Sequence, residues 1–86
     1  MKIRTVIIGM GKMGKLRYRV LNRHGGFEIV GICDPVEETM REYPERKYTD
    51  WKKCIKAEKP ELVLGSAERF EALSAPFTFT AHDYTD

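Results

Sequence analysis

The chain has 86 residues, of which 42% are hydrophobic and 33% are charged, so it can form one small folded domain and is too short for a two-domain enzyme. Fifteen Lys and Arg against thirteen Asp and Glu give a net charge of +2, unlike the one-signed charge of a nucleic-acid-binding domain. No apolar run approaches the roughly 20 residues that span a bilayer, and the N-terminus has no signal-peptide pattern. We therefore expect a cytoplasmic protein with neither a membrane nor a nucleic acid as partner.

The first predicted element is a strand over Ile3 to Ile8, rich in β-branched residues and typical of a strand buried on both faces of a parallel sheet. A G-x-G-x-x-G run, GMGKMG at residues 9–14, follows it directly. Such a run between a strand and a helix predicts a dinucleotide-binding turn. Gly9 would permit the tight turn, Gly11 the approach of a pyrophosphate to the backbone, and Gly14 the close packing of helix on strand.

The helix predicted after this turn has apolar residues at helical spacing, which we expect to lie on the sheet: Met13, Leu16, Val20 and Leu21. Its remaining positions are mostly basic: Lys12, Lys15, Arg17, Arg19 and Arg23. A solvated helix surface is the ordinary interpretation of these charges. Attraction of the phosphates of a dinucleotide and docking to an anionic membrane are the alternatives.

A second strand is predicted from Phe27 to Cys33, after a helix stop at Gly25. Asp34 ends this strand, twenty residues beyond Gly14 (34 − 14), where a carboxylate can accept hydrogen bonds from the adenosine ribose hydroxyls. A carboxylate there would repel the extra phosphate of NADP, so NAD is favoured over NADP. The alternative is that Asp34 only caps the turn that begins at Pro35.

A short helix is predicted next, because Val36, Met40 and Tyr43 are spaced at i, i+4 and i+7 before Pro44. Residues 45–47 are charged and predict a loop.

Another helix is predicted after an N-cap at Thr49 or Asp50, with Trp51, Cys54 and Ile55 on one face. That spacing favours a packing role for Trp51 over the stacking of a base. The apolar run from Leu62 to Gly65 predicts the third strand.

Four blocks of the sequence together resemble the N-terminal domain of the Gfo/Idh/MocA oxidoreductase family. They are VIIGMGKMG at residues 6–14, FEIVGICDP at residues 27–35, YTDW at residues 48–51 and KPELV at residues 59–63. The resemblance covers about residues 2–65, and it implies the Rossmann cofactor domain of an NAD(P)-dependent sugar or polyol dehydrogenase. It ends where this chain has GSAER at residues 65–69 in place of the Ala-Thr-Pro-like turn of the family.

The expected architecture is a truncated Rossmann-like α/β fold in three layers, with three or four parallel strands and helices on both faces. Residues 1–65 form the dinucleotide-binding unit, and residues 66–86 form a divergent tail. In this tail we expect a short helix capped by Ser66, with Ala67, Phe70 and Leu73 on its apolar face, and then an alternating strand over residues 77–80.

The candidate cofactor-binding residues are Gly9, Met10, Gly11, Lys12, Met13, Gly14 and Asp34. We expect no metal site, and we interpret Cys33 and Cys54 as free thiols because their spacing fits neither a metal motif nor a C-x-x-C pair. The catalytic lysine of the resembled family lies in a Glu-Lys-Pro motif after the fourth strand. Lys59 has the same neighbours but precedes the third strand, so we expect a solvated loop lysine. His82 and Asp83 lack the nucleophile-elbow pattern of a catalytic triad.

Three functions follow from these expectations. The first is NAD binding by a module without catalytic residues of its own, and the second is the working N-terminal part of a split or interrupted dehydrogenase. The third is an interaction protein that keeps the Rossmann scaffold without the cofactor. In each case an exposed sheet edge would favour a homo-oligomer or association with a larger enzyme, and a small core would give marginal stability.

Overall fold

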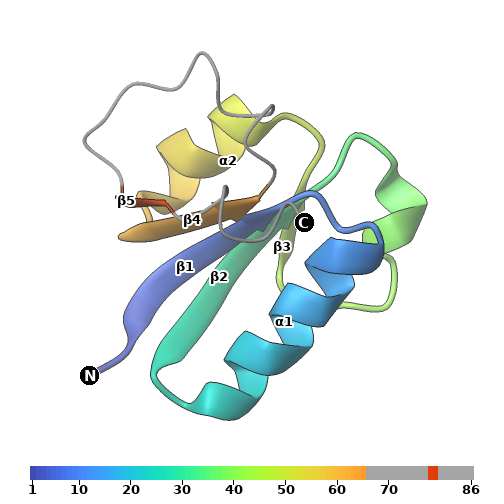
Figure 1. Cartoon of the computed structure of the whole chain (residues 1–86). Coiled ribbons are helices and arrows are strands. Elements are labelled where there is room, and N and C mark those ends of the chain that lie inside the picture. The colour runs from blue at the N-terminus through green and yellow to red at the C-terminus, as the bar shows by residue number, and fades with distance from the viewer. Residues whose placement is uncertain (66–77, 80–86) are drawn as a thin grey trace.

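A computed structural model describes residues 1–65 and 78–79 of the chain. The described residues form one sheet of five parallel strands in the order β3-β2-β1-β4-β5 (Figure 1). The strands are β1 (Ile3–Ile8), β2 (Phe27–Cys33), β3 (Arg46–Tyr48), β4 (Leu62–Gly65) and β5 (Thr78–Phe79). The helices are α1 (Lys12–His24), the 3₁₀ helix η1 (Glu37–Met40) and α2 (Trp51–Glu58).

The sheet separates two apolar clusters, and helices cover both of its faces, as expected for a three-layer α/β fold. Cys54 and Ile55 of α2 pack with Val6, Ile8 and other residues of one face. Leu21 of α1 packs with a second set on the opposite face. The central strand β1 is therefore buried on both sides, and Val6, Ile7 and Ile8 are each at most 2% exposed.

The sheet has more strands than the sequence predicted, because Arg46–Tyr48 is a strand and the predicted loop over residues 45–47 is wrong there. Gly31 of β2 pairs with Arg46, and Cys33 pairs with Tyr48. An edge strand of three residues with two exposed basic side chains lacks the apolar alternation by which strands are recognised.

The predicted strand over residues 77–80 is confirmed at Thr78–Phe79, which pairs with β4. The rest of that segment and the predicted helix that begins at Ser66 lie outside the described residues. The pair His82 and Asp83 also lies outside them.

Helix α1 is rotated relative to the prediction. Leu21 is buried, but Met13, Leu16 and Val20 are 39%, 44% and 55% exposed. Gly14 and Arg17 take their places on the sheet side of the helix, so Arg17 is not part of a solvated basic face. Gly14 sets the rotation because a Cβ there would lie 1.8 Å from the carbonyl oxygen of Gly9, so only a glycine can face the turn at this distance.

The helix predicted before Pro44 is only one 3₁₀ turn long. The Tyr43 N–H bonds the Met40 carbonyl at 3.1 Å, which is the shorter i to i+3 pattern. The Thr39 carbonyl, which an α-helix would offer to Tyr43, instead accepts from Lys15 Nζ at 2.7 Å. A contact with α1 therefore replaces the next helical hydrogen bond.

Helix α2 agrees with its prediction. The Asp50 side chain caps it by accepting from the Lys52 N–H at 2.9 Å. Trp51 packs against the cluster that contains Cys54 and Ile55, which confirms its packing role.

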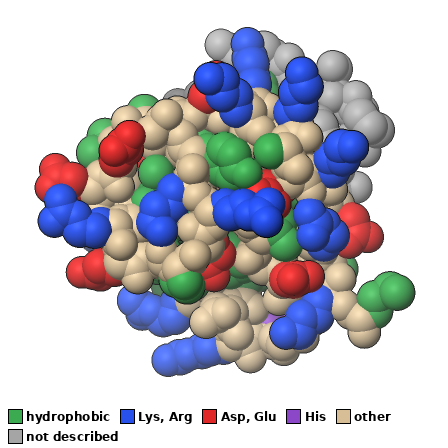
Figure 2. All heavy atoms as spheres, turned by 180° about the vertical axis from the view of Figure 1, so that it is seen from behind, with side chains coloured by type: hydrophobic (Ala, Val, Ile, Leu, Met, Phe, Trp, Pro, Cys, Tyr) green, Lys and Arg blue, Asp and Glu red, His purple; other side chains and the backbone are tan. Residues whose placement is uncertain are grey.

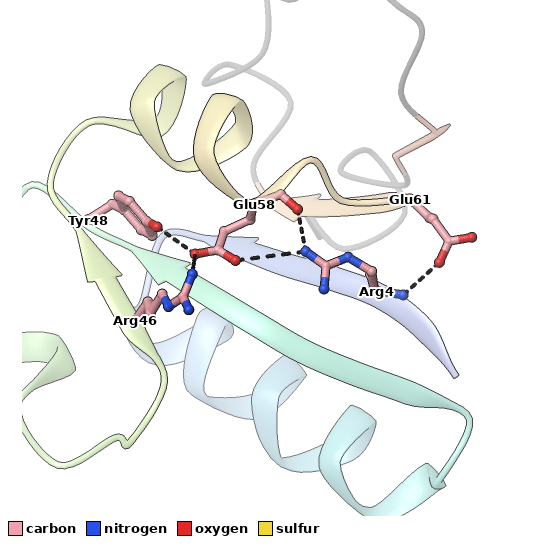
Figure 3. A network of polar contacts seen from close by, with 5 residues as sticks. All are labelled: Arg4, Arg46, Tyr48, Glu58 and Glu61. Atoms are coloured by element: carbon pink, nitrogen blue, oxygen red, sulfur yellow. Dashed lines mark hydrogen bonds and ion pairs between the residues drawn. The ribbon is translucent and has the colours of Figure 1, made fainter. Parts of the chain in front are cut away.

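A buried carboxylate, which the sequence did not predict, holds the end of α2 against the sheet (Figure 3). Glu58 is 4% exposed, accepts from the Tyr48 hydroxyl at 2.5 Å, and lies 3.4 Å from Arg46 and 3.9 Å from Arg4. The Arg4 side chain also donates to the Glu58 carbonyl, and the Arg4 N–H donates to Glu61 Oε1 at 2.9 Å. These contacts join β1, β3, α2 and the start of β4.

Candidate functional site

The glycine turn lies where β1 ends and α1 begins. Gly9 has φ = 96°, in the left-handed region that glycine adopts without strain, and its N–H donates to the Cys33 carbonyl at 2.6 Å. Gly14 packs directly against this turn. The turn is therefore fixed to the end of β2 on one side and to α1 on the other.

The start of α1 can accept an anion. Gly11 is the N-cap, and the Lys15 N–H to the Gly11 carbonyl, at 2.9 Å, is the first helical hydrogen bond. The N–H groups before Lys15 have no partner within the helix, no described side chain caps them, and α1 has no acidic residue in its first turn. A Cβ on Gly11 would meet no heavy atom of the described residues within 4 Å, so the space beside its backbone is open. Both properties fit a bound pyrophosphate.

Asp34 lies beside the glycine turn and is 6% exposed. Its Oδ2 accepts from the Met10 N–H at 2.7 Å, and its Oδ1 accepts from the Val36 N–H at 2.8 Å. The second bond is the turn-capping contact that we considered as the alternative role of Asp34. A carboxylate has about four acceptor positions, so these two bonds leave capacity for ribose hydroxyls.

The other candidate residues have different positions. Met10 is fully buried and its side chain belongs to the core below α1, so only its N–H faces the site. Lys12 is exposed and Met13 is 39% exposed. The site is therefore built mainly from backbone groups, with Asp34 as its charged side chain.

Two contacts that the sequence did not predict fix the segment that follows Asp34. Lys15 Nζ donates to the Thr39 carbonyl, and the Tyr18 hydroxyl bonds both carboxylate oxygens of Glu45, at 2.9 and 2.8 Å. Burial and this carboxylate raise the pKa of Tyr18 to about 12. The contacts hold the segment between β2 and β3 against α1, next to the candidate site.

The exposed charges form no single-signed surface in the view of Figure 2. Lys and Arg side chains are spread over this face, with Asp and Glu between them. Among the described residues, no helix is both long and apolar enough to cross a bilayer. The same residues contain no group of three His, Cys, Asp or Glu side chains placed to hold a metal ion.

Lys59 lies far from the glycine turn. It is exposed and ends α2, before β4, and β4 runs from Leu62 beside Thr5 to Gly65 beside Ile8. Lys59 is therefore at the amino end of the sheet, whereas the candidate site is at the carboxyl end.

Cys33 and Cys54 are free and buried. Burial raises the pKa of the Cys54 thiol to about 12, so this thiol is protonated at neutral pH and is a poor nucleophile.

Comparisons with known proteins agree with this geometry. Residues 3–73 match the family described as the Gfo/Idh/MocA oxidoreductase family, NAD-binding Rossmann fold. The chain belongs to this family. The match continues past residue 65, so the likeness to the Gfo/Idh/MocA family does not end where the sequence suggested. A search of curated proteins found no match.

Among solved structures, the fold resembles the WlbA dehydrogenase from Bordetella pertussis, which was solved in complex with NADH and UDP-GlcNAcA. The TM-score is 0.68 and the sequence identity is 22% over 74% of this chain. The aligned region is 21% of the WlbA chain, so the present chain spans about a fifth of the length of that dehydrogenase.

Proposed function

We propose that residues 1–65 of this Gfo/Idh/MocA family chain bind NAD as a cofactor module. The observation that carries the proposal is the open space at Gly11 beside the uncapped start of α1, with the Asp34 carboxylate next to the same turn. A dinucleotide needs both features, because its pyrophosphate is an anion and its adenosine ribose offers hydroxyl donors.

Each part of the site has a separate task in this proposal. The N–H groups around Gly11 and Lys12 donate to the pyrophosphate, and the α1 dipole favours the negative charge. Asp34 accepts from the ribose hydroxyls with the acceptor positions that Met10 and Val36 leave free. When bound, NAD supplies a nicotinamide ring that exchanges a hydride.

The same carboxylate supports NAD over NADP. The 2′-phosphate of NADP would lie against the buried Asp34 carboxylate, and two anionic groups at this distance repel each other. The residues that follow Asp34 are Pro35, Val36 and Glu37, none of them basic. The WlbA dehydrogenase, whose fold is similar, was solved with NADH, and this supports the same preference.

We propose further that the module is not catalytic alone, and that its cofactor-binding residues all lie within residues 1–65. A dehydrogenase needs groups that handle the substrate proton, and the carboxylate beside the glycine turn, Asp34, is assigned here to the ribose instead. The module would then act in the cytoplasm as part of a larger enzyme or as an oligomer joined through its sheet edge. A split dehydrogenase with its substrate domain on another chain is the alternative.

Calorimetric titration of the full chain with NAD and with NADP tests the proposal. We expect saturable binding of NAD and at least about tenfold weaker binding of NADP, which is about 1.4 kcal/mol. Binding should be lost in Gly11→Ala, whose fold should remain. A folded chain that binds neither dinucleotide would contradict the proposal and favour an interaction protein on this scaffold.

A further inference from the structure

Helix α1 carries an apolar strip that the fold leaves exposed. Met13, Leu16 and Val20 make up this strip, and they are 39%, 44% and 55% exposed. The strip borders a hollow of about 120 Å³ between α1 and β4, lined by Met13, Leu16, Arg17, Val20, Leu21 and Leu64. Three neighbouring apolar side chains at i, i+3 and i+7 next to a hollow have the shape that receives the side chains of another protein segment.

A ridge of positive charge runs beside the strip. Lys12, Arg19 and Arg23 are exposed and stand at i, i+7 and i+11, so they lie along one side of the helix. Leu16 is four residues from Lys12 and three from Arg19, so strip and ridge are adjacent. The sequence of α1 contains no Asp or Glu. No charge on this helix therefore balances the ridge.

We propose that the strip and the ridge together form a docking surface for an acidic amphipathic helix of a partner protein. Apolar side chains of that helix would enter the hollow beside Leu64, and its Asp or Glu residues would face Arg19 and Arg23. Charge complementarity selects this partner, because a carboxylate is what the unbalanced ridge attracts.

A second copy of the same chain fits this surface poorly. A two-fold dimer through α1 would place the same surface of both copies together, and their basic ridges would repel each other. An anionic membrane would also satisfy the charges. However, a bilayer surface cannot fill a concave hollow whose floor includes Leu64 of the sheet, whereas a side chain can.

The docking surface can be tested separately from the cofactor site. Arg19 is eight residues from Gly11 along α1, which corresponds to about 12 Å at 1.5 Å per residue. Substitutions at Arg19 and Arg23 should therefore leave NAD binding unchanged, and NAD affinity is the folding control for these substitutions. Circular dichroism is the folding control for Leu16→Glu with Val20→Glu.

The probes are two synthetic helical peptides, each roughly 18 residues long, with Leu at i, i+3, i+4 and i+7 and with either Glu or Lys at the other positions. We expect the Glu peptide to shift the amide NMR signals of Leu16, Val20 and Leu64 in the full chain, and the Lys peptide to leave them in place. Leu16→Glu with Val20→Glu should weaken binding of the Glu peptide by at least about tenfold. Arg19→Glu with Arg23→Glu should reverse the preference between the peptides.

The matched control is Lys53→Glu with Lys56→Glu, which makes the same charge change on exposed positions of α2 and should leave both peptides' affinities unchanged. Equal affinity for both peptides, no binding, or shifts confined to other elements would overturn the proposal. Vesicles containing phosphatidylserine provide a further probe. The surface would be assigned to membranes, against the proposal, by two results together. The chain would float with these vesicles and lose this property in Leu16→Glu with Val20→Glu, and it would bind both peptides weakly. A dimer in sedimentation that the same variant dissociates would assign it to a second copy.

Discussion

The Asp34 carboxylate accepts a hydrogen bond of 2.7 Å from the Met10 N–H, so the first residue after β2 holds the turn after β1 in place. The ends of β1 and β2 are thereby joined by a side chain as well as by the backbone hydrogen bond from the Gly9 N–H to the Cys33 carbonyl. One carboxylate thus shapes the glycine turn and forms part of the proposed ribose site, and its two roles can be separated by experiment.

Replacing Asp34 with Asn should weaken NAD binding by about 10- to 100-fold, since hydrogen bonds to a charged group contribute about 1.5–3 kcal/mol. The free energy of unfolding should fall by about 1–2 kcal/mol, because an amide cannot accept from Met10 and Val36 together. Calorimetry and urea unfolding measure the two effects. Asp50→Ala, which removes the cap of α2, is the control that lowers stability alone. Unchanged NAD affinity in Asp34→Asn would leave Asp34 only its turn-capping role.

Two glycines of the turn should respond in opposite ways to Ala. Gly11→Ala should keep the thermal midpoint within about 2 °C and abolish dinucleotide binding, because the new methyl group enters only the open space where the pyrophosphate is proposed to lie. Gly14→Ala should unfold the protein or lower its stability by several kcal/mol, about 3 or more, because its Cβ would lie 1.8 Å from the Gly9 oxygen. Circular dichroism melts with NAD titrations distinguish the two outcomes. A stable Gly14→Ala variant would refute the packing role.

Glu58 should be more important for stability than its surface partners. Glu58→Ala should cost about 3 kcal/mol, because it empties buried volume and leaves the Tyr48 hydroxyl without its acceptor. Glu58→Gln keeps that acceptor and should cost only about 1 kcal/mol, since Arg4 and Arg46 are 44% and 76% exposed and stay solvated. Chemical denaturation of both variants gives the comparison. Equal losses would mean that the ion pairs, rather than the Tyr48 contact, dominate.

Stability should fall in alkaline solution. Burial raises the pKa of Cys54 from 9.0 to about 12, so between these values the unfolded chain releases a proton that the folded chain retains. The stabilisation is complete below pH 9 and is lost as the pH rises toward 12. Tyr18, whose pKa is raised from 10.0 to about 12, adds to the same loss. Thermal melts from neutral pH up to about pH 12 give the melting temperature as a function of pH. The melting temperature should fall less steeply with pH in Cys54→Ala than in the unsubstituted chain. An equally steep fall in both proteins would show that Cys54 does not cause the alkaline loss of stability.

The sequence predicted the strand–turn–helix unit around the glycines well because its requirements are local. Gly9, Gly11 and Gly14 are fixed by the backbone of one strand–turn–helix unit, and Asp34 directly follows the next strand. The strands β1, β2 and β4 were also recognisable from their apolar runs, because burial on both faces favours apolar residues at successive positions.

The rotation of α1 could not be read from its apolar spacing. Met13, Leu16 and Val20 indicate one face of a helix, but the contact between Gly14 and Gly9 fixes another face on the sheet. A glycine has no hydrophobic signal, so periodicity underestimates its effect on packing. The Glu58 network was likewise invisible, since its partners lie 10 to 54 residues away in the sequence.

Strand β3 has a consequence for how the sheet can grow. Its three residues carry two exposed positive charges, and short, charged edge strands resist the addition of another strand. Among the described strands, the edge at β3 is therefore the less favourable one for a further strand, from this chain or from a partner. Growth of the sheet is thus directional: a new strand is expected beside β5 and not beside β3.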